Sequence, residues 1–435
     1  MLVRLFGENF GVFRDRFELS FEATALGTDE ERGYFEVPLK GESDPLRLLR
    51  MVAIYGPNAS GKSTIIRAAD ALWDLAVTSG PRSQEGESVS EYAPFKLSKE
   101  SRSEPSTLGC EVLVGDRKHG FSVVEYSVSF TSVEIVEEHI VEHRGERSHT
   151  WMNRSRNNIR LYDRRLPGQM SLDLGGVTRS NATAISVAAQ LNQKPLLGVF
   201  RALSDSLRTI TDSGLTGGCI QYSVDRLHRD ELFRNWSLQR LLMPADIGIV
   251  GVSTRKQELP IKLREAFSRF LENDDLKELE ERIEPVFTHR GVDGDYNLEF
   301  DTESSGTRKI MSLAGPWFDV VTDKLTVFVD ELSASLHPTL LISLLHSLNA
   351  PPSMPESQLA FTVHDPTPLE GVLRRDQVYF TEKNDQGMAA LIPLIDFRER
   401  KEHNIRKRYL EGRYGGVPRS PDFSRLFEEW HGNEE

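Results

Sequence analysis

The sequence is poor in cysteine and contains no long uninterrupted apolar run. Its two cysteines, Cys110 and Cys219, lie far apart and lack the close spacing of zinc ligands. Because so few thiols form neither a disulfide framework nor a metal site, we expect a reducing, cytoplasmic location. No apolar segment approaches the roughly 20 residues that span a bilayer, and no secretory leader is recognisable, so no membrane association is expected.

Basic residues are also fewer than acidic residues. The 53 Lys and Arg residues are outnumbered by 66 Asp and Glu residues, which gives a formal net charge of −13. This balance does not favour sequence-independent binding of nucleic acid. A local basic groove is still compatible with an acidic protein. For one arginine-rich stretch with aromatic neighbours we favour a solvated loop over a contact with nucleic acid or an acidic partner. It contains Trp151, Arg154, Arg156, Arg160, Tyr162, Arg164 and Arg165.

The most informative segment is a complete G-x-x-x-x-G-K-S phosphate-binding loop. It reads Gly56, Pro57, Asn58, Ala59, Ser60, Gly61, Lys62 and Ser63, with Thr64 directly after it. The glycines let backbone N–H groups converge on phosphate oxygens, Lys62 can reach the β- and γ-phosphates, and the Ser63 hydroxyl can hold Mg²⁺. A buried strand is expected over 48–55 and a helix over 64–72, whose N-terminus would face the phosphates. The chain is therefore predicted to bind a nucleoside triphosphate.

A second half of the nucleotide site is predicted near residue 330. An apolar strand over 325–329 ends in Asp330 and Glu331. Asp330 can hold the Mg²⁺ shell, and Glu331 can polarise the attacking water. The next strand, over 358–363, runs into His364, which can contact the γ-phosphate. Strands that alternate with helices in this way predict an α/β fold with a mostly parallel sheet.

Small residues also precede a helical pattern upstream of this strand. Their hydroxyl groups and the backbone N–H groups of a helix N-terminus predict an anion site. They are Ser304, Ser305, Gly306 and Thr307. Further helical patterns are expected from a cap at 180–181 to about residue 242, and over 262–284.

The order of these pieces resembles the ABC-type ATPase heads of the structural-maintenance, RecF-like and OLD-like group. In this resemblance, residues 304–307 stand for the signature motif, 332–337 for the D-loop and His364 for the switch histidine. The signature differs at Ser305 and Thr307, where a glycine and a glutamine are usual. The D-loop ends in His337, and no glutamine stands at the position of the Q-loop, near residues 93–96.

A closer resemblance is to bacterial abortive-infection ATP-binding proteins of the AbiL or RloA kind. It rests on residues 8–10 with Phe13, 55–63, 245–249, 330–331 with 336–338, and 409–418, together with the serine-rich signature. It implies a slow ATP hydrolase that uses ATP and Mg²⁺ and belongs to a phage-defence pair. Its partner is an effector protein encoded nearby, and a nuclease is one class of effector. The alternative is a RecF-like or structural-maintenance-like ATPase that clamps DNA in repair.

The resemblance also implies a domain organisation and an assembly. Residues 1–107 and 291–435 would form the two parts of an ABC-type P-loop ATPase head. Residues 108–290 would form an insert of strands followed by a mainly helical lobe. In such heads the signature of one copy closes over the nucleotide of another, which implies a homodimer or a higher even-numbered oligomer.

Overall fold

The computed structural model describes residues 1–25, 32–145, 147–162, 174–210, 218–246, 248–256, 283–334, 336–349, 356–399 and 403–416. Several predicted features lie outside these ranges: Arg164, Arg165, residue 247, residue 335 of the D-loop, residues 417–418, and the helix over 262–284 up to residue 282. Within the described ranges, no helix combines the length and the apolar character needed to cross a bilayer.

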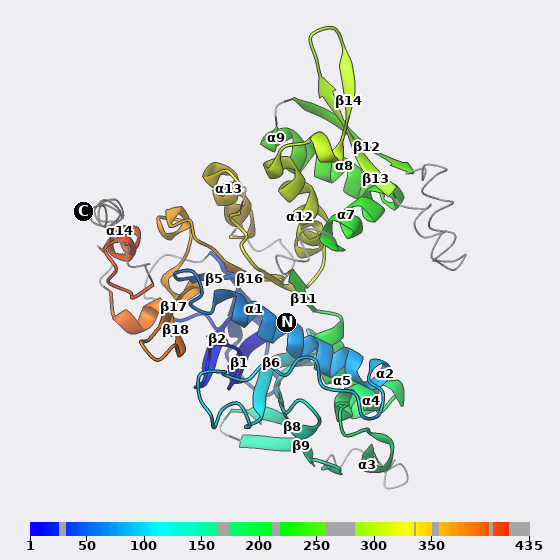
Figure 1. The fold of residues 1–435 in the computed structure, drawn as a ribbon, viewed down its shortest axis with the longest axis vertical. Helices are drawn as coiled ribbons and strands as arrows, with labels where there is room; N and C mark the ends of the chain where they lie inside the picture. Colours follow the sequence, from blue (N-terminus) through cyan, green and yellow to red (C-terminus); the bar gives the residue numbers. More distant parts are fainter. Residues whose placement is uncertain are drawn as a thin grey trace, which may run out of the picture.

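A six-stranded sheet forms the middle of the molecule (Figure 1). Its order is β11-β15-β16-β5-β17-β18, in which only β18 runs antiparallel to its neighbour. The central strands β5 and β16 are buried at every position, which explains why they appear as apolar runs in the sequence. The predicted α/β class is therefore confirmed. The strands are β5 (Met51–Tyr55), β11 (Leu207–Ile210), β15 (Thr326–Val329), β16 (Gln358–Thr362), β17 (Val378–Lys383) and β18 (Ala389–Pro393).

Helices cover both faces of this sheet. On one face, α1 (Lys62–Trp73) packs Ile65 and Ile66 into a core that also contains Val52 of β5. On the other face, α12 (Ser305–Thr322) and α13 (Pro338–Leu348) bury Trp317 and Leu341 against the sheet. Burial on both faces makes the sheet a rigid platform for the loops at its edge.

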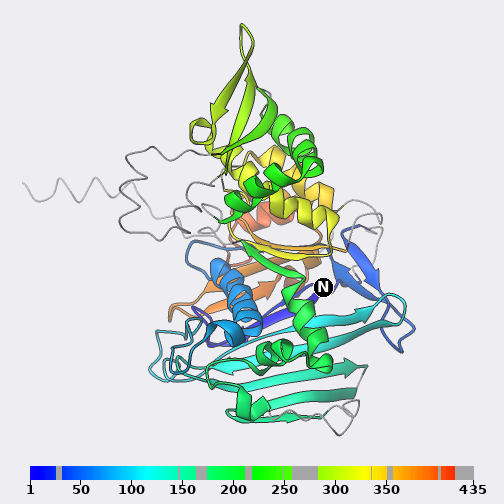
Figure 2. The same ribbon diagram turned by 90° about the vertical axis from the view of Figure 1, so that its right-hand side faces the viewer.

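A seven-stranded antiparallel sheet lies on the far side of α1 (Figure 2). Its order is β10-β9-β8-β7-β6-β1-β2. Because β6 pairs with β1 on one side and with β7 on the other, the boundary that we expected between residues 107 and 108 falls inside one sheet. The strands are β1 (Leu2–Glu8), β2 (Phe17–Ser20), β6 (Ser106–Asp116), β7 (Gly120–Phe130), β8 (Ile135–Arg144), β9 (Arg147–Ser155) and β10 (Asn158–Leu161).

The third part is a small lobe beyond α12, at the top of Figures 1 and 2. Its three-stranded sheet, of order β12-β13-β14, packs with its helices around Phe287 and Phe233. Ile310 and Phe318 of α12 belong to the same core, so this helix joins the lobe to the parallel sheet. The elements of the small lobe are α7 (Gly218–Arg229), α8 (Glu231–Ser237), α9 (Met243–Ala245), β12 (Ile249–Lys256), β13 (Ile283–Arg290) and β14 (Asp295–Glu299).

The remaining regular elements are short. Two helices, α4 and α5, occupy the start of the segment expected to be helical up to residue 242, but β11 interrupts that segment. The short elements are β3 (Tyr34–Val37), β4 (Leu46–Leu49), α2 (Ser79–Arg82), α3 (Leu174–Val177), α4 (Ala184–Gln190), α5 (Lys194–Ser204) and α14 (Ile405–Leu410).

The arginine-rich stretch is not a loop where the structure describes it, because residues 147–161 form the hairpin β9–β10. Arg156 and Arg160 are exposed as expected, but Arg154 is buried. The Arg154 side chain is 1% exposed and pairs with Glu138, whose carboxylate is fully buried (3.4 Å). Arg154 Nη1 also donates to the Ala182 carbonyl (2.6 Å), while Glu138 accepts from two N–H groups at the start of α4. This arginine therefore holds α4 to the antiparallel sheet and does not face a ligand.

Replacing Arg154 with Ala is expected to lower the free energy of unfolding by about 3–5 kcal/mol, because it leaves the Glu138 charge buried without its partner. Arg156 is the matched control, since its pair with Glu134 is exposed. Arg156→Ala is expected to cost less than about 1 kcal/mol. Urea unfolding of both variants measures the difference, and equal losses would contradict the structural role of Arg154.

Candidate nucleotide-binding site

The predicted site residues follow the carboxyl ends of three neighbouring parallel strands. The phosphate loop follows β5, Asp330 follows β15, and His364 lies two residues after β16, which runs between them. The charges of Asp330 and Glu331 act on the pKa of both Lys62 and His364, so these four side chains lie near one another. The sheet order therefore brings together three segments, of which the first and last lie more than 300 residues apart in the chain.

Close packing explains both glycines of the phosphate loop. A Cβ atom on Gly56 would collide with the Thr381 hydroxyl and lie 2.7 Å from Ser60 Oγ. Gly61 adopts a φ of +113° at the N-cap of α1, and a Cβ atom there would lie 3.0 Å from the ring of Phe13. Ala59 also has a positive φ, of +62°. These conformations turn successive backbone N–H groups toward one concave side, where phosphate oxygens can be held.

Lys62 is the buried cation of the loop. Its Nζ atom donates to the carbonyl oxygens of Gly56 and Pro57, both at 2.9 Å. Burial lowers the pKa of Lys62, and the carboxylates of Asp330 and Glu331 act in the opposite direction. Two carbonyl dipoles compensate a buried ammonium only in part, so a phosphate placed here would gain a strong charge-assisted hydrogen bond.

The other loop residues divide into exposed and structural positions. Asn58 and Ser63 are exposed at the mouth of the loop. Ser60 is buried and donates to the Pro57 carbonyl (2.8 Å), while Thr64 is buried and accepts from Arg67 (3.0 Å). Ser63 is therefore the loop hydroxyl that can reach a metal ion on the phosphates.

Thr362 organises the two carboxylate residues. Its hydroxyl donates to Asp330 Oδ1 (2.6 Å) and accepts from the Glu331 N–H (2.7 Å). Glu331 adopts a φ of +50°, a conformation that costs a residue with a side chain about 1–2 kcal/mol. Lys309 of α12 donates to the Glu331 carbonyl (3.3 Å). These contacts hold the strained backbone that directs Asp330 and Glu331 to the loop side of the sheet.

The residues present fit a divalent cation. Asp330 is 7% exposed, and among the described hydrogen bonds only its Oδ1 atom accepts one. A buried carboxylate oxygen near Lys62 and the exposed hydroxyl of the next residue are suitable ligands for Mg²⁺, so Asp330 and Ser63 would hold the ion. When bound, it would neutralise charge on the phosphates.

His364 completes this half of the site. Burial lowers its pKa, and the positive charge of Lys62 lowers it further, which keeps the imidazole neutral at pH 7. A neutral imidazole donates one hydrogen bond without adding a second cation beside Lys62.

The predicted signature residues form the N-terminus of α12. Ser304 is the N-cap, and its hydroxyl accepts from the Thr307 N–H (3.1 Å) and contacts the Thr307 hydroxyl (2.8 Å). Ser304 and Ser305 are exposed, Gly306 is half-buried and Thr307 is buried. Across the described residues, no hydrogen bond or ion pair joins residues 304–307 to Lys62 of the same chain. Ser305 and Gly306 therefore offer their polar groups outward.

A model of the family described as "AAA domain, putative AbiEii toxin, Type IV TA system" matches residues 51–370. The chain belongs to this AAA-domain family. Membership confirms the predicted ATPase class and with it nucleotide binding. The matched range contains all the predicted site residues: the phosphate loop, residues 304–307, Asp330, Glu331 and His364. No curated protein matches the chain.

Solved structures that are similar to this AAA-domain chain include three SMC head domains. The head domain from Thermotoga maritima is 13% identical in sequence to this chain, with a TM-score of 0.39. The match covers 90% of this chain and 98% of the Thermotoga chain. A head bound to the C-winged helix domain of ScpA is 11% identical (TM-score 0.46; 90% and 96% covered). A Pyrococcus furiosus head with an extended coiled coil is 12% identical (TM-score 0.43; 95% and 99% covered).

Residues 409–416 of the AAA-domain chain pack against the end of β5 and the first glycine of the phosphate loop. Tyr409 lies edge-on to Tyr55 (5.5 Å between ring centroids) and is stacked on Phe380, as is Tyr414 (4.9 Å). A Cβ atom on Gly416 would lie 3.7 Å from the Gly56 Cα. This contact gives a physical role to residues 409–416, which the sequence linked to the site only through a resemblance.

Two threonines of the site were not predicted from the sequence. Thr362 ends β16, and Thr381 lies in β17, where it contacts Ser60 and donates to the Tyr55 carbonyl (3.2 Å). The signal that could have found them is a small hydroxyl residue near the carboxyl end of an apolar parallel strand.

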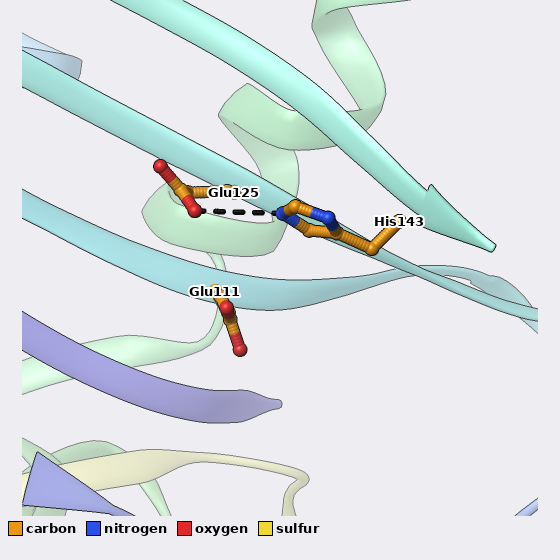
Figure 3. Close-up of side chains that lie close together, drawn as sticks. All are labelled: Glu111, Glu125 and His143. Carbon is orange, nitrogen blue, oxygen red and sulfur yellow. Dashed lines mark ion pairs between the residues drawn. The ribbon is translucent and has the colours of Figure 1, made fainter. Parts of the chain in front are cut away.

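A separate cluster of potential metal ligands lies on the antiparallel sheet (Figure 3). Ligand atoms of Glu111, Glu125 and His143, from β6, β7 and β8, lie within 4.8 Å of one another. His143 Nε2 is 3.4 Å from Glu125, and Arg4 Nε is 3.7 Å from Glu111. Burial raises the pKa of Glu111, which Arg4 opposes. Because Arg4 and His143 already face these carboxylates, the cluster is explained as a charge network and we assign no metal to it.

Proposed function

We propose that this protein is an ATP hydrolase that dimerises on ATP and regulates a partner effector in anti-phage defence, as in abortive-infection proteins of the AbiL or RloA kind. The observation that carries the proposal is the division of the site. One copy assembles the phosphate loop, the carboxylates and His364, whereas Ser304 and Ser305 of its signature turn are exposed, and no hydrogen bond or ion pair of the described residues joins the turn to that site. Such a copy binds ATP but lacks one side of a closed pocket.

The second side would come from a second copy. Ser305 and Gly306 of that copy hydrogen-bond the γ-phosphate of ATP seated on Lys62, and two-fold symmetry creates two equivalent sites. ATP then favours the dimer only because the dimer adds contacts to the γ-phosphate that ADP lacks. Glu331 polarises the attacking water, His364 donates to the γ-phosphate, and cleavage into ADP and phosphate removes the link between copies.

The effector and the setting belong to the same proposal. The matching family's description refers to a putative toxin and a type IV toxin–antitoxin system, which supports a setting of this two-component kind. The net charge of −13 favours a protein effector over direct, sequence-independent binding of nucleic acid. The scarcity of cysteine is consistent with action in the cytoplasm.

The proposal is tested on the unmodified protein by its size and its hydrolysis rate. With ATP and Mg²⁺, light scattering should detect a dimer, and with ADP a single copy. The rate per copy should rise with protein concentration to a plateau, and duplex DNA should leave it unchanged. A rate that is independent of concentration would refute the shared site, and a salt-sensitive stimulation by DNA would favour a DNA clamp instead.

A further inference from the structure

The structure assigns a positioning role to Glu303 and His289, which together fix the turn that presents Ser305 and Gly306. Glu303 directly precedes the N-cap Ser304, and its carboxylate is 3% exposed. His289 Nε2 lies 2.7 Å from Glu303 Oε1. Because a carboxylate can only accept, Nε2 carries the proton and the imidazole donates to Glu303.

The sheet of the small lobe sets the position of His289. His289 lies on β13, the central strand of the three-stranded sheet, opposite Ile249 of β12 and Tyr296 of β14. A Cβ atom on Gly248 would lie 3.1 Å from His289 Nδ1, so only glycine fits beside the ring without displacement. The Asp246 carboxylate accepts from the Gly248 N–H (3.0 Å).

These contacts give a use to residues 246 and 248, which belong to a segment singled out in the sequence whose role was open. Gly248, held by its bond to Asp246, leaves room for the His289 ring, and the ring in turn contacts Glu303. The Glu303 N–H also donates to the Phe300 carbonyl (3.2 Å), which holds the backbone just before the signature. Two groups, the His289 ring and the Phe300 carbonyl, therefore contact the residue that precedes Ser304.

Loss of the contact between His289 and Glu303 should affect the assembly of two copies and should not affect the binding of ATP by one copy. Glu303 and His289 make no described contact with the phosphate loop, and Ser304 caps α12 through its own hydroxyl. Loss of the His289 contact leaves a buried carboxylate without its donor beside the signature turn. The turn can then shift, and the groups offered to the ATP of a second copy lose their alignment.

This inference rests on the proposed ATP-dependent dimer, so it is tested in the Glu331→Gln background, where that dimer should persist. His289→Ala should raise the protein concentration for half-dimerisation in ATP roughly tenfold or more. The affinity of dilute, single copies for ATP should stay within about twofold, because Lys62 and its loop are untouched. His289→Gln, whose amide can still donate to Glu303, should recover most of the loss.

His228→Ala is the matched control, because His228 lies in the same lobe and its hydrogen bond ends on Thr254. It should dimerise like the parent. Unchanged dimerisation of His289→Ala, or an equal loss of single-copy ATP affinity, would overturn the positioning role while the proposed function stands. A Glu331→Gln parent that stays monomeric in ATP would overturn both.

Discussion

Glu331→Gln is expected to trap the protein as an ATP-bound dimer and to slow hydrolysis by roughly 10²-fold or more, the usual range for loss of a general base. Glutamine keeps the size of the side chain, and the backbone contacts of Glu331 to Thr362 and Lys309 do not involve the carboxylate. The variant therefore loses the group that polarises water but keeps the geometry of the site. Size-exclusion chromatography with light scattering, together with phosphate release, measures both effects.

Glu370→Gln provides the control for the removal of one carboxylate. Glu370 is exposed and pairs with Arg406 away from the nucleotide residues. This variant should hydrolyse ATP and change size like the unmodified protein. A Glu331→Gln protein that stays monomeric in ATP, or that hydrolyses at the unmodified rate, would contradict the role of Glu331.

Lys62→Ala is expected to weaken ATP binding by roughly 10²-fold or more. Hydrogen bonds from a charged donor contribute about 1.5–3 kcal/mol each, and the ammonium can donate to both the β- and γ-phosphates. The fold should survive, because Nζ donates only to the loop carbonyls of Gly56 and Pro57 in the described hydrogen bonds and burial already disfavours its charge. Titration with a fluorescent ATP analogue measures the affinity.

Lys383→Ala is the matched control for Lys62→Ala. Lys383 also donates to a carbonyl of the phosphate loop, that of Ala59 (3.3 Å), but it lies on the exposed side. Its loss should change the affinity by less than about threefold, as expected for an exposed polar contact. Similar losses in the two variants would show that general positive charge, and not the buried ammonium, holds the phosphates.

The parts of the site that the sequence predicted share local signals. The phosphate loop has a fixed spacing between its glycines and Lys62, and the buried strands around it appear as apolar runs. Asp330, Glu331 and His364 follow such runs, and parallel strands place their carboxyl ends at one edge. The α/β class and these positions therefore followed from short-range patterns.

The features that the sequence did not predict depend on contacts between distant segments. β11 has only four residues and owes its place to pairing with β15, more than 100 residues away. Arg154 appeared solvated because nothing local shows that Glu138 receives it in the core. The link between His289 and Glu303 arises only after β12, β13 and β14 form a sheet. Side-chain identity predicts charge at these positions, and tertiary packing decides whether that charge is exposed.

The central claim is that two copies share each ATP, with Lys62 from one copy and Ser305 from the other. It is tested most directly by mixing Lys62→Ala with Ser305→Trp, in which a bulky ring blocks the signature turn. Each variant alone should be nearly inactive. In a mixed dimer, one site combines an intact loop with an intact signature, so the mixture should regain hydrolysis, up to about a quarter of the unmodified rate for random pairing. A mixture no more active than the sum of its parts, or a Ser305→Trp variant that hydrolyses ATP at the full rate alone, would contradict the account.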